Sequence, residues 1–218
     1  MGALFSLNEN FADLCAENKC YQSYFIHKTY QPTECVRQMG DSIEYFGIVT
    51  EGILKAVSDT VGGMELCHTY FQSKDIFPEL LYFSGKRHYA FSLYAVKKTK
   101  VIWIPVEIME EMLSSDPQLM YSFILCISQR GLKDQLFLNC LNYHTIRQRI
   151  AFWIVGMHDI TMNNTVPLTS SQSILANMLH VSRASLNKEL NLMDKEGFFT
   201  IADGEVRDID FDRLSELI

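Results

Sequence analysis

The stretch from Pro117 to Tyr143 constrains the fold most, because it has no internal proline and a single glycine, Gly131. Asp116, a capping residue, precedes a proline at the first helical position, so we predict that one helix starts here. Such a helix measures roughly 40 Å, more than a small domain can cover. We expect one face to pack on the preceding domain and a second stripe to meet a twin chain. That stripe consists of Met120, Ile124, Ile127, Asp134, Leu138 and Leu141.

Upstream of this helix the pattern is typical of short strands separated by turn signals. The strand candidates are Ile43–Val49, Ile53–Val57, Met64–Phe71, Tyr89–Val96 and Val101–Ile104. Gly62-Gly63 predicts a tight hairpin. The spacing of the strands predicts a sandwich or a barrel-like roll. Residues 1–20 are predicted to form a short helix or arm, and Pro105 is predicted to begin a helix that ends near Leu113.

Downstream, the pattern is helix, tight turn, helix and small hairpin, which is the order of a winged helix-turn-helix. A first helix is predicted over Arg147–Met157, and a second is expected to be capped by Thr169 and to end near Leu179. The helix after the turn is predicted over 183–195, with Ser182 as its cap and Gly197 as its end. The hairpin strands are predicted over 198–201 and 205–209.

Composition and spacing exclude several classes of protein. The apolar runs are too short to span a bilayer and no basic leader precedes them, so we expect a cytoplasmic protein with reduced cysteines. Neither the six cysteines nor the six histidines show paired ligand spacing, so we expect no metal and no cofactor. No catalytic motif is present, and we expect no enzyme.

These segments, in this order, resemble the Crp/Fnr family of bacterial transcription regulators. Leu175-Ala176-Asn177-Met178-Leu179-His180-Val181-Ser182-Arg183 resembles the family signature LA-x-x-LG-x-SR. Further matches are Phe46–Gly52, Asp75–Leu80 and Arg149-Ile150-Ala151. The resemblance implies an α+β chain made of a double-stranded β-helix or jelly-roll sensor domain (1–116), a dimerisation helix (117–143) and a winged helix-turn-helix (144–218). It also implies a homodimer on palindromic double-stranded DNA, with RNA polymerase as a candidate partner.

The resemblance assigns DNA contacts to the helix 183–195 and to the wing. The residues at the matching positions are Ser182, Arg183, Ser185, Lys188 and Arg207. An arginine at a helix N-terminus can pair with guanine O6 and N7. Ala184 and Asn187 depart from the catabolite activator, so the half-site of that protein is not expected here. The net charge of −7 predicts few phosphate contacts, to which Arg147 and Arg149 would add.

The same resemblance locates an effector pocket in the roll. The matching positions are Glu79, Leu80, Tyr89, Ala90, Phe91, Asp134 and Gln135. Tyr89 and Ala90 replace the Arg-Ser pair that holds a cyclic phosphate, and an unpaired buried phosphate is costly. We therefore expect a small-molecule effector that is not a cyclic nucleotide. The alternative is a roll filled by its own side chains that senses nothing.

Two sensor types of the family are not expected. Cys15, Cys20 and Cys35 are wrongly spaced for an iron–sulfur centre, and the position near Leu80 has no histidine for haem. Two functions remain. The first is a DNA-binding regulator, and the alternative is a ligand- or redox-responsive protein-interaction module without DNA binding.

Overall fold

The computed structural model describes residues 10–59, 65–168 and 172–218. The chain divides into two compact units, Met1–Ile127 and Ser128–Ile218, and the boundary falls inside helix α4 (Pro117–Cys140). The long helix predicted from the sequence is confirmed, and it ends at Cys140, followed by a turn. The predicted division at residues 116 and 143 stays a prediction.

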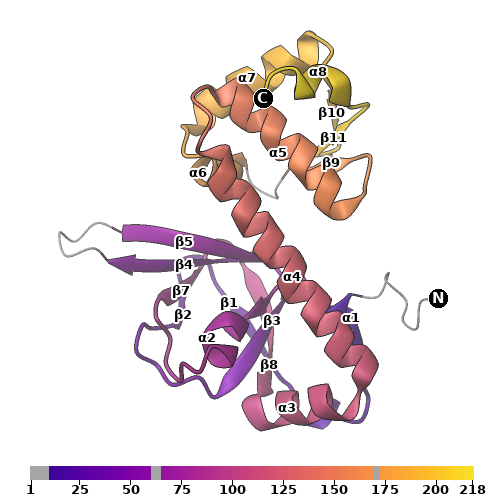
Figure 1. Ribbon diagram of the computed structural model, residues 1–218. Helices are drawn as coiled ribbons and strands as arrows, with labels where there is room; N and C mark the ends of the chain where they lie inside the picture. Colours follow the sequence, from indigo (N-terminus) through magenta and orange to yellow (C-terminus); the bar gives the residue numbers. More distant parts are fainter. Residues whose placement is uncertain (1–9, 60–64, 169–171) are drawn as a thin grey trace. The chain divides into compact units, whose positions relative to one another are not determined.

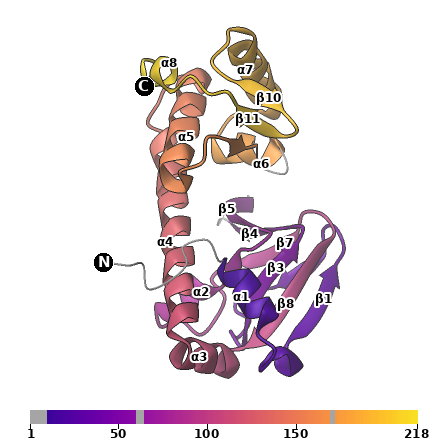
Figure 2. The same cartoon turned by 90° about the vertical axis from the view of Figure 1, so that its right-hand side faces the viewer.

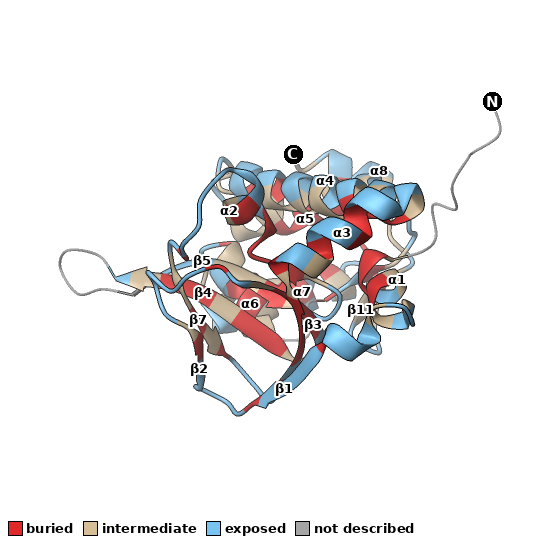
Figure 3. Cartoon of the chain, turned by 90° about the horizontal axis from the view of Figure 1, so that it is seen from below, coloured by how far each residue is buried: buried red, intermediate tan, exposed pale blue. Residues whose placement is uncertain are grey.

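The first unit is a roll of two four-stranded antiparallel sheets (Figure 1). One sheet has the order β1-β8-β3-β6 and the other β2-β7-β4-β5. The strands are β1 Ile26–Tyr30, β2 Cys35–Arg37, β3 Tyr45–Glu51, β4 Ile53–Asp59, β5 Glu65–Gln72, β6 Ile76–Phe77, β7 Ser92–Ala95 and β8 Thr99–Pro105. Most of β3, β4 and β8 is buried, and each is an inner strand of its sheet. Figure 3 shows the buried parts of β3 and β4 in red.

The five predicted strands are present, whereas β1, β2 and β6 were not predicted one by one. In β1 only Tyr30 is buried, so the strand lacks the alternation that marks a half-buried strand. β2 and β6 are too short to show a period. The predicted hairpin at Gly62-Gly63 lies outside the described residues.

Four α-helical segments lie around these sheets in the part of the first unit that the structure describes. They are α1 Phe11–Glu17, α2 Glu79–Phe83, α3 Val106–Ser115 and the first part of α4. Asn10 caps α1 by accepting a hydrogen bond from the Ala12 amide at 2.9 Å. The prediction that Pro105 begins α3 was wrong by one residue, because Pro105 still pairs with Tyr45 in the sheet. The ring of Phe123 on α4 lies 5.2 Å from the rings of both Phe11 and Phe83, so α1 and α2 meet α4 there.

The second unit is a winged helix-turn-helix, as predicted (Figure 2). Its elements are α5 Ile146–Thr161, β9 Val166–Pro167, α6 Gln172–Met178, α7 Arg183–Lys195, β10 Thr200–Ala202, β11 Glu205–Arg207 and α8 Phe211–Ser215. The hairpin β10–β11 gains β9 as a third strand on its β11 side. Trp153, Leu175, Leu186, Leu190 and Phe199 are central to its core. The predicted cap Thr169 lies outside the described residues.

Two features of this unit extend the prediction. Thr145 and Gln148 form a capping box that fixes the start of α5, and α5 runs beyond the predicted Met157. Helix α8 was not predicted, because a single turn shows no helical period. Within the described ranges, none of the helices combines the length and the hydropathy that a membrane span needs.

Candidate functional site

Helix α7 presents one polar face and one buried face. Leu186, Leu190 and Met193 are buried in the core of the unit, whereas Arg183 and Lys188 are exposed. Ser182 Oγ accepts a hydrogen bond from the Ser185 amide at 3.0 Å and donates one to Ser185 Oγ at 2.8 Å. Four of the five predicted DNA-contacting residues therefore lie together at the first two turns of one helix.

The turn before α7 differs from the family signature at one residue, His180. His180 occupies the glycine position of that signature and has a φ of 53°, in the left-handed region that favours glycine. The turn is closed by the Val181 amide, which donates to the Ala176 carbonyl at 2.9 Å. The turn therefore adopts a left-handed backbone at a position where this chain has histidine.

Most arginines of the second unit bind groups within the unit. Arg147 binds Glu189 at 2.6 Å and Glu196 at 2.8 Å. Arg149 donates to the carbonyls of Tyr143 and Leu179 at 2.9 and 2.8 Å. Arg213 donates to the carbonyls of Glu196 and Gly197. The phosphate contacts expected of Arg147 and Arg149 would compete with these bonds.

The side chains of Arg183 and Lys188 differ from this pattern. Neither forms an ion pair or a hydrogen bond with any residue that the structure describes. Their charges therefore point to solvent on a rigid, capped helix. Such a surface is what a ligand with phosphate or guanine acceptors requires.

Arg207, the fifth predicted residue, is on β11 and not on α7. Its guanidinium binds the carboxylates of Asp203 and Glu205, each at 3.1 Å. The wing thus offsets its own positive charge. A phosphate would have to displace these carboxylates to reach Arg207.

The predicted effector residues do not share one environment. Glu79 and Tyr89 are each 2% exposed, Phe91 is half-buried, and Ala90 and Leu80 face solvent, with Leu80 58% exposed. Asp134 and Gln135 belong to the second unit, so their approach to the roll stays a prediction.

Aromatic side chains fill the middle of the roll. The ring of Phe77 lies 5.1 Å from that of Phe71 and 5.3 Å from that of Trp103. Phe77 also packs directly on the backbone of Gly47, where any Cβ would overlap the ring. This packing favours the alternative of a self-filled roll for its central part.

Two polar side chains contact the buried Trp103 ring, which the sequence did not indicate. Trp103 Nε1 donates a hydrogen bond to the Tyr30 hydroxyl at 3.0 Å. The guanidinium carbon of Arg37 lies 4.0 Å from the centre of the Trp103 ring. Burial raises the pKa of the Tyr30 hydroxyl, and the charge of Arg37 partly opposes the increase. No motif marks Arg37, because its strand is short and its neighbours come from distant segments.

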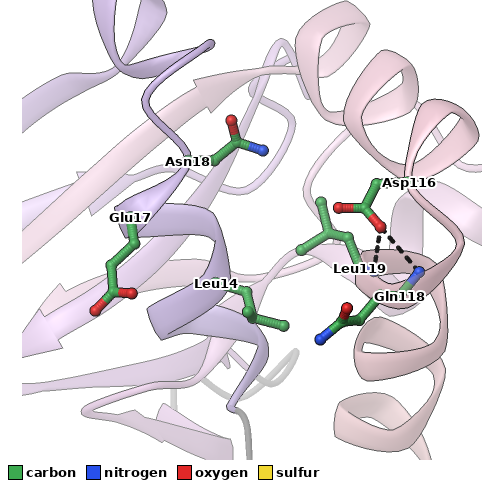
Figure 4. A pocket seen from close by; sticks show the side chains of 6 residues that line it. All are labelled: Leu14, Glu17, Asn18, Asp116, Gln118 and Leu119. Carbon is green, nitrogen blue, oxygen red and sulfur yellow. Dashed lines mark hydrogen bonds between the residues drawn. The ribbon is translucent and has the colours of Figure 1, made fainter. Parts of the chain in front are cut away.

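A pocket of about 230 Å³ lies between α1 and the start of α4 (Figure 4). It is lined by Leu14, Glu17, Asn18, Asp116, Gln118 and Leu119. Asp116 Oδ1 accepts hydrogen bonds from the amides of Gln118 and Leu119 at 2.9 and 3.2 Å, so this carboxylate already caps α4. Across the described ranges, no three metal-binding side chains gather at one place.

The comparisons with known proteins agree with this architecture. Residues 27–116 match the family model of the cyclic nucleotide-binding domain. No curated protein matches the sequence. A mutant of CooA from Carboxydothermus hydrogenoformans aligns at a TM-score of 0.69 and 15% identity, over 96% of this chain and 95% of that one. FixK2 from Bradyrhizobium japonicum aligns at 0.63 and 14%, over 88% and 96%. The CRP-family transcriptional regulator TTHB099 from Thermus thermophilus aligns at 0.53 and 17%, over 87% and 95%.

Proposed function

The chain has the fold of the Crp/Fnr regulators, and on that premise we propose that it is a homodimeric transcription regulator. The dimer binds a palindromic site in double-stranded DNA, and α7 enters the major groove. Its two-fold axis requires half-sites about one helical turn apart. It acts in the cytoplasm, where RNA polymerase is its candidate partner.

One observation carries the proposal. In a unit whose Arg147, Arg149, Arg207 and Arg213 all bind internal acceptors, Arg183 and Lys188 have no ionic or hydrogen-bonded side-chain contact within the described chain. Both stand on the exposed face of a helix whose start is fixed by Ser182. An exposed, unpaired arginine on a rigid helix can make a bidentate contact to guanine at little cost in side-chain rearrangement.

The dimer is supported by the exposed apolar residues of α4. They are Tyr121, Ile124, Leu132 and Leu138, the last of which is 67% exposed in the single chain. Large apolar side chains gathered on one helix mark an interface. A second copy of α4 is the partner that a two-fold DNA site requires.

We further propose that the effector is not a cyclic nucleotide. The residues at the positions of the phosphate-binding pair are Tyr89, which is buried, and Ala90, which has no hydrogen-bonding side chain. A cyclic nucleotide that raises the melting temperature of the protein would contradict this part of the proposal.

The test of the function is selection of a binding sequence from random duplexes, followed by titration. Arg183→Ala should weaken binding to the selected duplex by about 1–3 kcal/mol per half-site and relax discrimination at one base pair. Asn191→Ala is the matched control, because Asn191 is exposed on the same helix and carries no charge. If Arg183→Ala binds the selected and scrambled duplexes as the parent does, α7 is not the recognition helix.

A second candidate function is supported by the wing. Its only arginine, Arg207, is held by Asp203 and Glu205, and an acidic wing disfavours DNA. The chain would then act as a ligand- or redox-responsive protein-interaction module. Failure to select any duplex sequence would favour this candidate over the first.

A further inference from the structure

Arg37 has more hydrogen-bonding capacity than the surrounding protein uses. A guanidinium has five N–H donors. Within the described chain, Arg37 donates a hydrogen bond from Nη1 to the Val36 carbonyl at 3.0 Å, and its guanidinium carbon lies over the Trp103 ring. No described carboxylate forms an ion pair with it. The ring of Trp103, which is itself anchored to Tyr30, fixes where this charge lies.

Tyr89 brings a second unsatisfied group to the same place. Its hydroxyl is buried and makes no well-aligned hydrogen bond with a described residue, although the Arg37 guanidinium lies near enough to act on it as a donor. Its backbone pairs with Gly40 and Asp41, which closely follow Arg37 in the chain, at 2.9 Å in both cases. Burial raises the pKa of the Tyr89 hydroxyl, and the charge and hydrogen-bonding contact of Arg37 partly oppose that increase. The hydroxyl and the guanidinium are therefore neighbours. A buried hydroxyl without a well-aligned hydrogen bond is costly and requires an explanation.

We propose that Arg37 and Tyr89 bind the oxyanion group, carboxylate or phosphate, of an acidic small-molecule effector. This inference rests on the sensor role in the proposed function and deepens it. The guanidinium supplies paired donors in the geometry that an oxyanion accepts, and the hydroxyl supplies a further donor. The positive charge thus comes from β2, and not from the segment after α2 as in cyclic nucleotide-binding relatives.

Arg87 offers a matched comparison within the roll. It also stacks on an aromatic ring, with its guanidinium carbon 4.6 Å from the centre of the Tyr82 ring. Its Nη1 donates to the carbonyls of Tyr82 and Lys86, and the residue is exposed. No orphan hydroxyl within the described residues adjoins Arg87. An oxyanion should therefore bind at Arg37 and not at Arg87.

The experiment uses Trp103 as the reporter and contains no DNA. The chain has two tryptophans, so Trp153→Phe leaves Trp103 as the only indole. Sodium acetate and sodium phosphate are titrated against sodium chloride at equal ionic strength. We expect a saturable change of Trp103 emission with at least one oxyanion and none with chloride. Saturation with acetate indicates a site for a carboxylate, and saturation with phosphate indicates a site for a phosphate. The apparent affinity should fall at least tenfold in Arg37→Gln and in Tyr89→Phe, and should not change in Arg87→Gln.

Calorimetric titration of the unsubstituted chain measures the same affinities, so the result does not depend on the Trp153→Phe substitution. The proposal is overturned if neither oxyanion saturates in either assay, or if Arg87→Gln abolishes the response while Arg37→Gln preserves it. Because DNA is absent, a chain that binds oxyanions without binding DNA refutes only the proposed function. A chain that selects DNA but does not bind oxyanions refutes only this inference.

Discussion

The guanidinium of Arg147 on α5 donates a hydrogen bond to the carboxylate of Glu189 on α7, with 2.6 Å between Nε and Oε1. The same guanidinium also binds Glu196, just after α7. One side chain thus joins two helices of the second unit. Arg147→Met should lower the free energy of unfolding of that unit by about 1 kcal/mol, since the groups are partly solvated. Urea unfolding followed by helical circular dichroism measures this. Arg207→Met, which breaks pairs inside one hairpin, is the control and should have a smaller effect.

The Arg147 contact also makes stability depend on pH. The hydrogen bond from Arg147 lowers the pKa of Glu196 below its ordinary value of 4.5. A lowered folded-state pKa means that the stabilisation is fully present above pH 4.5 and is lost as the pH falls through the folded-state value. The parent should therefore be more stable than Glu196→Gln at pH 7, and the difference should shrink as the pH falls below 4.5. A difference that grows on acidification would contradict the assignment.

His180 has a positive φ that glycine adopts without strain. His180→Gly should stabilise the second unit by up to about 1 kcal/mol, because the left-handed cost of a side chain exceeds the added entropy of the unfolded glycine. Asn177→Gly, in helix α6, should destabilise by a similar amount. Thermal unfolding of both variants tests the two signs together.

The exposed face of α4 predicts how dimerisation can be disrupted. Ile124 is 50% exposed in the single chain, so Ile124→Asp should leave the monomer folded and weaken the dimer. Ile127, named from the sequence, is half-buried against the core of the first unit and is a less selective site. Met39→Asp, also at an exposed apolar residue, is the control. Sedimentation at micromolar concentration should show more monomer for Ile124→Asp alone.

The charge environments of Lys188 and Arg207 predict different salt dependences. Lys188 makes no ion pair within the described part of the chain, so Lys188→Ala should reduce the salt slope of DNA binding by about one unit for each phosphate that the variant can no longer neutralise. Arg207→Ala should change the slope much less, because Asp203 and Glu205 already offset its charge. Titrations at several salt concentrations compare the slopes. Equal slopes for the two variants would contradict this difference.

The sequence predicted best where local chemistry marks both ends of an element. Helix α7 has the predicted bounds, since Ser182 caps its start and Gly197, with a φ of 75°, ends it. Strands with several buried β-branched or aromatic residues were also found. Strand β1 and helix α2 were not predicted, because the first depends on pairing with β8 and the second is a single turn.

The two candidate sites also differ in how far the sequence could predict them. The α7 face is local in sequence, so a motif could identify it. The cluster of Arg37, Tyr89 and Trp103 joins three distant segments, and only tertiary packing brings them together. Leu80 was assigned to the effector pocket because its position matches a family motif, but its side chain is exposed in this structure. Alignment to a family assigns a position but does not determine its burial.

The close packing of Phe77 on the backbone of Gly47 limits where an effector could gain binding energy in the roll. The packing around Phe77 leaves an effector only contacts outside this filled part of the roll. Converting a 1:99 equilibrium of two states into 99:1 takes about 5.5 kcal/mol of differential affinity. Even the best small ligands gain only about 1.5 kcal/mol per non-hydrogen atom in total binding, and only part of that distinguishes two states. Under the proposed function, an effector whose differential affinity falls below about 5.5 kcal/mol would shift only part of the population at saturation.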